Sequence, residues 1–253
     1  MVERIERRVL AAVRFVDRAT HSRISHSLRV QAEGVTFVRN RSGLYVVTQA
    51  PSLTDYTQSF EQPPAEPAVG SVLIRARVDD PSGTYLPRLF AINLPRNSNI
   101  TGAMAPNSLF TPIEVALYAA ATRPLALKWT VLRASILNAG DGGPVVGALL
   151  RVVNVASGFV LASGASDARG EALVVIPGVP VTQFGSSDDN DNSPAAGPVV
   201  VTEMAARIEV SQRLGATWPD DFDQAEGAHA GAVRLTRDIT LRSGRTETAV
   251  LVL

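Results

Sequence analysis

Apolar and polar residues alternate along most of this chain. Val72, Ile74 and Val78 fall on one face of an extended segment, and Arg75 and Arg77 fall on the other. A strand with this period of two rests one face on a core and turns the other to water. The same alternation predicts strands in further segments, namely 9–17, 28–32, 132–136, 148–153, 207–211 and 233–242.

Three segments carry less simple patterns. Residues 248–253 are apolar on both faces, which predicts a central strand or one covered on both sides. Residues 111–114 read Thr-Pro-Ile-Glu, a sequence that could cap a helix. Apolar positions nevertheless alternate over 113–117, so we favour a strand there. A short helix around 221–228 is compatible with the sequence, and glycines within and after it argue against a long one.

Turn-forming residues separate the predicted strands at short intervals. Asn40-Arg-Ser-Gly43 and Asp80-Pro-Ser-Gly83 each stand between two apolar runs. Pro81 supplies the φ near −65° that the second turn position requires, and Gly83 can relax the exit. No strand is followed by a long segment of helical period. The sequence therefore predicts an all-β chain, with two antiparallel β-sandwich units, Ig-like or transthyretin-like, in tandem.

We expect an N-terminal sandwich over 1–97, a linker or crossover over 98–124 and a C-terminal sandwich over 125–253. A polar loop at 185–198, rich in Asp, Asn and Ser, would be inserted in the second unit. The two halves also echo each other, since Leu28-Arg-Val30 matches Leu150-Arg-Val152. A duplication would explain the match, and so would chance similarity between two β-hairpins.

One stretch of the second half, residues 129–179, resembles a known module. The residues that carry the likeness are Gly143-Pro-Val-Val-Gly-Ala148, Ser166-Asp-Ala-Arg-Gly170 and Leu173-Val-Val-Ile-Pro177. This pattern is similar to the carboxypeptidase regulatory-like domain, a transthyretin-like β-sandwich, although Ser166 replaces the usual threonine. The resemblance implies a sandwich fold and a module whose members are usually non-catalytic. Physically, Asp167 can accept backbone N–H groups across its turn while Gly170 takes positive φ.

A fainter resemblance extends over the whole chain. Val13-Arg-Phe-Val-Asp17, Asn40-Arg-Ser-Gly-Leu-Tyr-Val46 and Asp80-Pro-Ser-Gly-Thr-Tyr-Leu-Pro-Arg88 look like segments of small β-rich proteins encoded with phage-tail-like contractile particles. These are residues of strands and turns with no chemical site among them. The resemblance implies a role in an assembly and no activity.

Composition narrows the classes of function. The 253 residues include 24 Lys and Arg and 24 Asp and Glu, so there is no excess of basic residues to favour binding to nucleic acid. No cysteine is present, which excludes disulfides, thiolate metal sites and cysteine nucleophiles. No apolar run approaches the length of a membrane span, so we expect no membrane insertion. The N-terminus has no secretory pattern, which predicts a cytoplasmic protein or a component of a particle.

The three histidines offer little chemistry. His21 and His26 are five residues apart, a spacing that suits neither a strand face nor a helical metal site, so we expect both to be solvated. His229 lies close in sequence to four acidic residues, namely Asp220, Asp221, Asp223 and Glu226. A carboxylate–histidine site is one reading of this group, and a flexible acidic loop is the one we favour.

Two weak ligand sites remain. Asp188, Asn190 and Asn192 supply calcium-type oxygens, but the glycine and glutamate of an EF-hand loop are missing. Trp218 could stack a sugar if it is exposed, whereas Trp129 suits a core.

No catalytic, phosphate-binding or dinucleotide motif occurs in the sequence, so we expect no enzyme and no cofactor. The sequence predicts a non-catalytic structural or interaction protein that binds other protein subunits. The alternative is a soluble carbohydrate- or small-ligand-binding module. The oligomeric state is left open.

Overall fold

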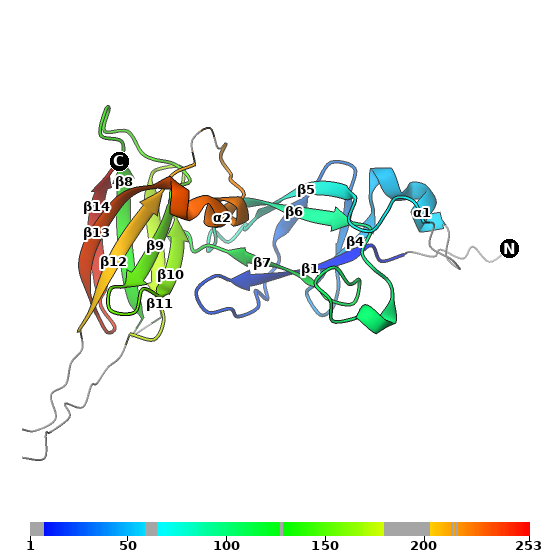
Figure 1. Ribbon diagram of the computed structural model, residues 1–253, viewed down its shortest axis with the longest axis horizontal. Coiled ribbons are helices and arrows are strands. Elements are labelled where there is room, and N and C mark those ends of the chain that lie inside the picture. The colour runs from blue at the N-terminus through cyan, green and yellow to red at the C-terminus, as the bar shows by residue number, and fades with distance from the viewer. Residues whose placement is uncertain (1–7, 59–64, 127–128, 180–202, 214, 216) are drawn as a thin grey trace, which may run out of the picture. The chain divides into compact units, whose positions relative to one another are not determined.

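The computed structural model describes residues 8–58, 65–126, 129–179, 203–213, 215 and 217–253. These residues form an all-β fold, as predicted, and they divide into two compact units (Figure 1). Unit 1 comprises the chain up to Leu117 together with Pro219–Asp223. Unit 2 comprises Tyr118–Trp218 together with Gln224–Leu253. The polar loop expected at 185–198 lies outside the described residues.

Unit 1 is a sandwich of two sheets. One sheet has the order β3-β4-β1-β7 and the other β2-β5-β6. The segment 98–124, expected as a linker, contains β7, which pairs in parallel with β1 of this unit. The strands are β1 (Ala11–Asp17), β2 (Arg29–Gln31), β3 (Thr36–Arg39), β4 (Tyr45–Gln49), β5 (Val72–Asp79), β6 (Arg88–Leu94) and β7 (Ile113–Leu117), and the short helices are η1 (Pro51–Leu53), α1 (Thr54–Gln58) and η2 (Ile100–Gly102).

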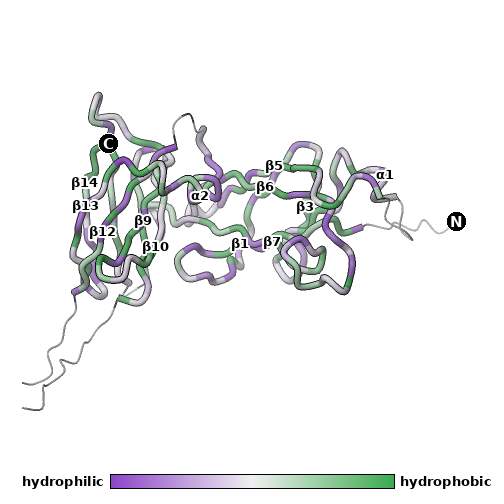
Figure 2. Tube along the Cα trace, in the orientation of Figure 1, coloured by the Kyte–Doolittle hydropathy of each residue, from purple (hydrophilic) through white to green (hydrophobic). Residues whose placement is uncertain are grey.

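The core of unit 1 lies between its sheets. Phe15 of β1 meets Tyr45 of β4 and Phe90 of β6 edge to face, with ring centroids 5.3 and 5.6 Å apart. The Tyr45 hydroxyl also donates to the carbonyl of Leu28 and accepts from its N–H, so this buried polar group is satisfied. Apolar residues alternate with hydrophilic ones along the strands (Figure 2), which matches the period-two pattern of the sequence.

Unit 2 is also a sandwich. Its sheets have the orders β11-β8-β14 and β10-β9-β12-β13, and their inner faces enclose a separate apolar core. The strands are β8 (Thr130–Leu137), β9 (Leu149–Asn154), β10 (Val160–Ala165), β11 (Glu171–Ile176), β12 (Glu203–Ser211), β13 (Val233–Arg242) and β14 (Thr246–Val252), with the helix α2 (Phe222–Ala232) between β12 and β13.

The two units share one order of connections. The first strand of each unit (β1 or β8) pairs antiparallel with the fourth (β4 or β11) and parallel with the last (β7 or β14). The fifth strand (β5 or β12) pairs with the second (β2 or β9) and with the sixth (β6 or β13). The third strand differs, because β3 pairs with β4 whereas β10 pairs with β9. The Leu-Arg-Val match of the sequence falls at the second strand of each unit. Each sandwich thus contains one parallel pair that the antiparallel prediction lacked.

Two element predictions were wrong in extent or place. The helix predicted around 221–228 extends to Ala232 and runs through Gly227 and Gly231, both exposed and free of close neighbours. Residues 248–253, predicted as a central or doubly covered strand, belong to β14, which pairs only with β8 among the described strands. Val250 and Val252 are 59% and 50% exposed. An apolar run does not reveal sheet position, because valine suits a strand of either kind.

Candidate interaction surfaces

His229 lies in a buried polar cluster on unit 2. Its Nδ1 is 2.7 Å from the Ser211 hydroxyl, and its Nε2 is 3.2 Å from a carboxylate oxygen of Glu209. The favoured reading, a flexible acidic loop, was wrong, because His229 belongs to α2 and is buried. The alternative, a site formed by His229 with the acidic residues at 220–226, was also wrong, since the carboxylate beside His229 is that of Glu209 on β12. Glu209 and Ser211 lie two residues apart on that strand and so share the face that packs against α2.

The order serine, histidine, carboxylate is that of a nucleophile with its base, but burial argues against such a use. Ser211 and His229 are 3% and 2% exposed, so the hydroxyl is largely shielded from solvent. A second contact also ties this helix down, since Arg151 of β9 pairs with Glu226, which accepts a hydrogen bond from Tyr118. The cluster therefore anchors α2 to the sheet of β9 and β12.

The other two histidines do not share a site. His26 Nε2 lies 3.1 Å from the carboxylate of Asp80, and its ring stacks on Tyr85 at 6.0 Å. His21 sits in a turn at positive φ. Among the described residues, no group of three or more His, Asp or Glu side chains is placed to hold a metal ion.

Asp80 organises the turn that the sequence singled out. Its carboxylate accepts hydrogen bonds from the hydroxyl and N–H of Ser82 and from the N–H groups of Thr84 and Tyr85. Burial acts to raise the pKa of this carboxyl, but the hydrogen bonds and the charge of His26 outweigh it and hold the pKa below its usual value.

The structure describes only some of the residues that the sequence predicted to bind a ligand. Asp188, Asn190 and Asn192 lie outside the described residues. Trp218 is half-buried, with its ring about van der Waals distance from the position that a side chain on Gly147 would take. Trp129 is likewise half-buried, under the guanidinium of Arg123 at 5.3 Å. No helix among the described residues is long and apolar enough to span a membrane.

In the described part of the chain, the side of β14 that faces away from β8 is a sheet edge, which we call the β14 edge. The carbonyl of Arg245 and the N–H of Leu253 point toward β8, so the backbone groups of Thr246, Thr248, Val250 and Val252 point away from it. No described strand pairs with that side. One acceptor is occupied, because the exposed side chain of Arg237 donates to the carbonyl of Val250 at 3.0 Å.

A hollow adjoins the β14 edge. It measures about 480 Å³ and is lined by Thr248, Ala249 and Val250, by Arg237, and by Arg133, Ser135 and Glu171 of the neighbouring strands. Glu171 accepts a hydrogen bond from Ser135 at 2.9 Å, so this pair is fixed in place. A strand edge, exposed valines and a polar hollow therefore lie together on one side of unit 2.

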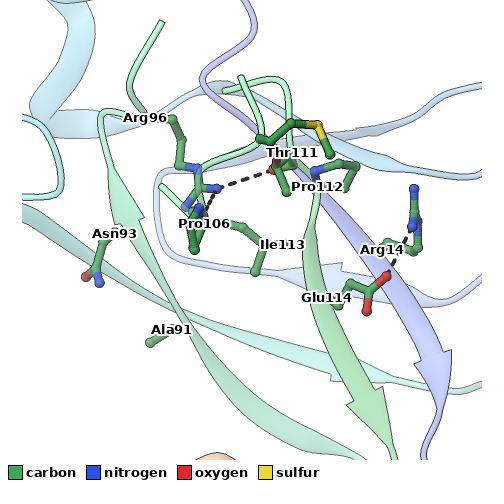
Figure 3. A pocket seen from close by; sticks show the side chains of 10 residues that line it. Arg14, Ala91, Asn93, Arg96, Pro106, Thr111, Pro112, Ile113 and Glu114 are labelled. Atoms are coloured by element: carbon green, nitrogen blue, oxygen red, sulfur yellow. Dashed lines mark hydrogen bonds and ion pairs between the residues drawn. The ribbon is translucent and has the colours of Figure 1, made fainter. Parts of the chain in front are cut away.

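A second surface lies on unit 1 beside the loop 97–111. Arg96 enters this loop, and its guanidinium donates to the carbonyls of Pro106 and Thr111 (Figure 3). It also donates to the carbonyl of Ser108. The loop exposes large apolar side chains, with Met104 at 91% and Ile100 at 71%. Next to it is a pocket of about 540 Å³, the Arg96 pocket, lined by Arg14, Ala91, Asn93, Arg96, Met104, Pro106, Thr111, Pro112, Ile113 and Glu114.

Sequence reasoning missed both buried arginines. Arg88 is fully buried, and its guanidinium reaches the carboxylates of Asp221 and Asp223 in the segment assigned to unit 1. Arg96 was passed over because one arginine between Pro95 and Asn97 resembles any loop residue. For Arg88 the acidic run at 220–223 was an available signal, since a buried cation is usually paired with a carboxylate.

The comparisons with known proteins do not assign this chain to a family. No family model matches the chain, and no curated protein matches it in sequence. Among solved structures, a streptococcal ancillary pilin covers 86% of this chain at 12% identity with a TM-score of 0.26, and the Bacillus anthracis TIE protein covers 96% at 11% with 0.27. A minor pilin of Streptococcus agalactiae covers 85% at 7% with 0.27. The chain spans 49%, 33% and 65% of these proteins, respectively.

Proposed function

We propose that this chain is a non-catalytic structural or interaction protein, a β-sandwich subunit or accessory of a larger protein assembly. The observation that carries the proposal is the β14 edge. Its backbone donors and acceptors at Thr246, Thr248, Val250 and Val252 point away from β8. An extended segment of another subunit can add there as a further strand, with main-chain hydrogen bonds for affinity.

The side chains of the β14 edge suit such an addition. Val250 and Val252 offer apolar area to a neighbouring strand, and the hollow beside them can receive a partner side chain. Arg237 occupies one acceptor of this edge, because it donates a hydrogen bond to the Val250 carbonyl. A partner strand must replace that hydrogen bond with one from its own N–H. Since Arg237 is exposed on β13, its side chain can return to water when a partner strand arrives.

The resemblances in the sequence support the same class of function. Carboxypeptidase regulatory-like modules, which residues 129–179 resemble, are usually non-catalytic parts of larger proteins. The fainter resemblance to proteins of phage-tail-like contractile particles makes such a particle the first assembly to examine, with the cytoplasm as the place of synthesis.

A single substitution tests the proposal. Val250→Pro removes an N–H that points away from β8, and proline is tolerated on an edge strand, so the unit should stay folded. In extracts of the source cells, we expect the tagged wild-type chain to sediment in a high-mass fraction with other subunits, and the Val250→Pro chain to sediment as the free protein.

The control is Val250→Thr, which keeps the N–H and a β-branched side chain and should still assemble. Circular dichroism checks that both variants are folded. A wild-type chain that sediments alone would refute an assembly role. Equal assembly of the proline and threonine variants would refute the β14 edge as the contact.

A further inference from the structure

Arg96 is a buried cation whose charge has no counterpart in the described chain. The residue is 9% exposed, and its Nε and Nη2 both donate to the carbonyl of Ser108, at 3.2 and 2.9 Å. Nη2 also reaches the carbonyls of Pro106 and Thr111. All of these acceptors are neutral, and no carboxylate of the described residues pairs with Arg96. Burial lowers the pKa of this guanidinium, because a low-dielectric site disfavours its charged form.

One nitrogen of Arg96 remains available. Nη1 makes no hydrogen bond to the described residues, and it is not among their buried polar atoms that lack a partner, so it has access to solvent. Arg96 lines both the Arg96 pocket and a smaller hollow of about 300 Å³ on the same unit. Nη1 carries two N–H donors on a charged group, and such donors form their strongest hydrogen bonds with ionised acceptors such as a carboxylate.

The remaining charges of the Arg96 pocket cancel. Arg14 and Glu114 lie opposite each other on β1 and β7, and their side chains pair at 3.1 Å (Figure 3). The pocket lining therefore carries one uncompensated positive charge, that of Arg96. Met104 and Ile113 add apolar area to the same lining.

We propose that the Arg96 pocket binds a carboxylate, with Nη1 of Arg96 as the charged donor and Met104 as an apolar contact. The inference concerns unit 1 and does not depend on the β14 edge. The carboxylate belongs either to an acidic side chain of a partner polypeptide or to a free organic acid. Both sources share the recognition chemistry, and the pocket has volume for either.

Titration of the full-length chain tests the proposal, with NMR signals of Asn93, Arg96 and Ile113 as the readout. The probes are the peptides acetyl-Leu-Glu-Leu-amide and acetyl-Leu-Gln-Leu-amide, and glutarate. We expect the glutamate peptide to shift these signals saturably and the glutamine peptide to leave them unchanged. Saturable binding of glutarate as well identifies free acids as a source, whereas binding of the glutamate peptide alone identifies a polypeptide.

Substitution of Met104 tests the site without removing Arg96, which also holds the loop. Met104→Glu places a carboxylate beside the pocket and should raise the Kd of the glutamate peptide at least about threefold, the range of a solvent-exposed charge pair. Met104→Gln removes the apolar contact without adding a charge and should therefore raise the Kd less than Met104→Glu does. Ile100→Glu adds the same charge on the same loop outside the pocket lining and should leave the Kd unchanged.

Three results would overturn the carboxylate site. These are no shift with any probe, equal shifts with the glutamate and glutamine peptides, and equal weakening by Ile100→Glu and Met104→Glu. Since Met104 and Ile100 are both mostly exposed, none of these variants should disturb folding, and the spectrum of each variant reports this directly.

Discussion

At the scale of single residues, polar groups in this protein serve mainly to fix the backbone. Asp80 accepts hydrogen bonds from the N–H groups of its own turn. The buried Ser166 binds a segment distant in sequence, since its hydroxyl accepts from the N–H of Ala148 and donates to the carbonyl of Val145. Tyr45 bridges to both backbone groups of Leu28. Each side chain offsets the cost of burying main-chain polar groups near a strand end.

The Asp80 carboxylate gives unit 1 a predictable response to acid. Its pKa is lower in the folded chain than in the unfolded one, so the unfolded state binds a proton first as the pH falls. The stability it contributes is therefore present above the ordinary aspartate pKa of about 4 and is lost as the pH falls through the lower folded value.

We expect Asp80→Asn to destabilise unit 1 by about 1–2 kcal/mol at pH 7 and by progressively less below about pH 4. Hydrogen exchange of the β5 and β6 amides, measured from pH 7 to pH 3, checks this. A cost that stays constant over that range would show that the charge of Asp80 contributes nothing to folding.

At the scale of elements, turns hold the strands in register. Gly170 ends the turn between β10 and β11 at φ 76°, and Asp167 accepts the N–H groups of Arg169 and Glu171 across it. Both features follow the sequence prediction. The structure adds that Gly170 lies against β8, where a Cβ would come within 2.6 Å of the Ile136 carbonyl oxygen.

Gly170→Ala should therefore destabilise unit 2 strongly, by about 3 kcal/mol or more, because it adds a backbone clash to the cost of positive φ. Gly158→Ala is the matched control, since Gly158 has φ 71° with no atom within 4 Å of its Cβ position. It should cost only about 1–2 kcal/mol.

Urea unfolding followed by tryptophan fluorescence measures both variants, because Trp129 and Trp218 both belong to unit 2. Equal costs for the two substitutions would mean that the approach to Ile136 exerts no strain.

The sequence predicted most strands and turns because alternation and turn chemistry are local properties. β5, β12 and β13 follow their patterns closely, and the strand reading of 113–117 was confirmed as β7. Pairing is not local, so β14 was wrongly given a covered position. The partners of His229 were missed for the same reason, because Glu209 and Ser211 reach it only through the packing of α2 on β12.

At the scale of the whole molecule, the chain returns to unit 1 after forming most of unit 2. Pro219–Asp223 brings Asp221 and Asp223 to the fully buried guanidinium of Arg88, at 3.4 and 2.7 Å. The same segment accepts the N–H of Leu89 at the Asp220 carbonyl. Unit 1 thus depends on residues that follow β12 in the sequence.

A fragment of residues 8–117 should be less stable than unit 1 in the full chain, by about 2 kcal/mol, because Arg88 keeps its buried charge and loses its carboxylates. Arg88→Met should stabilise the fragment and destabilise the full chain. Hydrogen exchange of the β1 amides measures both comparisons. The same sign in fragment and full chain would refute this role of Asp221 and Asp223.

The return of residues 219–223 also limits how this protein can be rearranged in evolution. A gene segment that encodes β1–β7 cannot be transferred alone without leaving a buried cation unmatched, and one that encodes β8–β14 carries five residues of the other unit with it. If the two units arose by duplication, they have since become tied, so we expect recombination to exchange them as a pair.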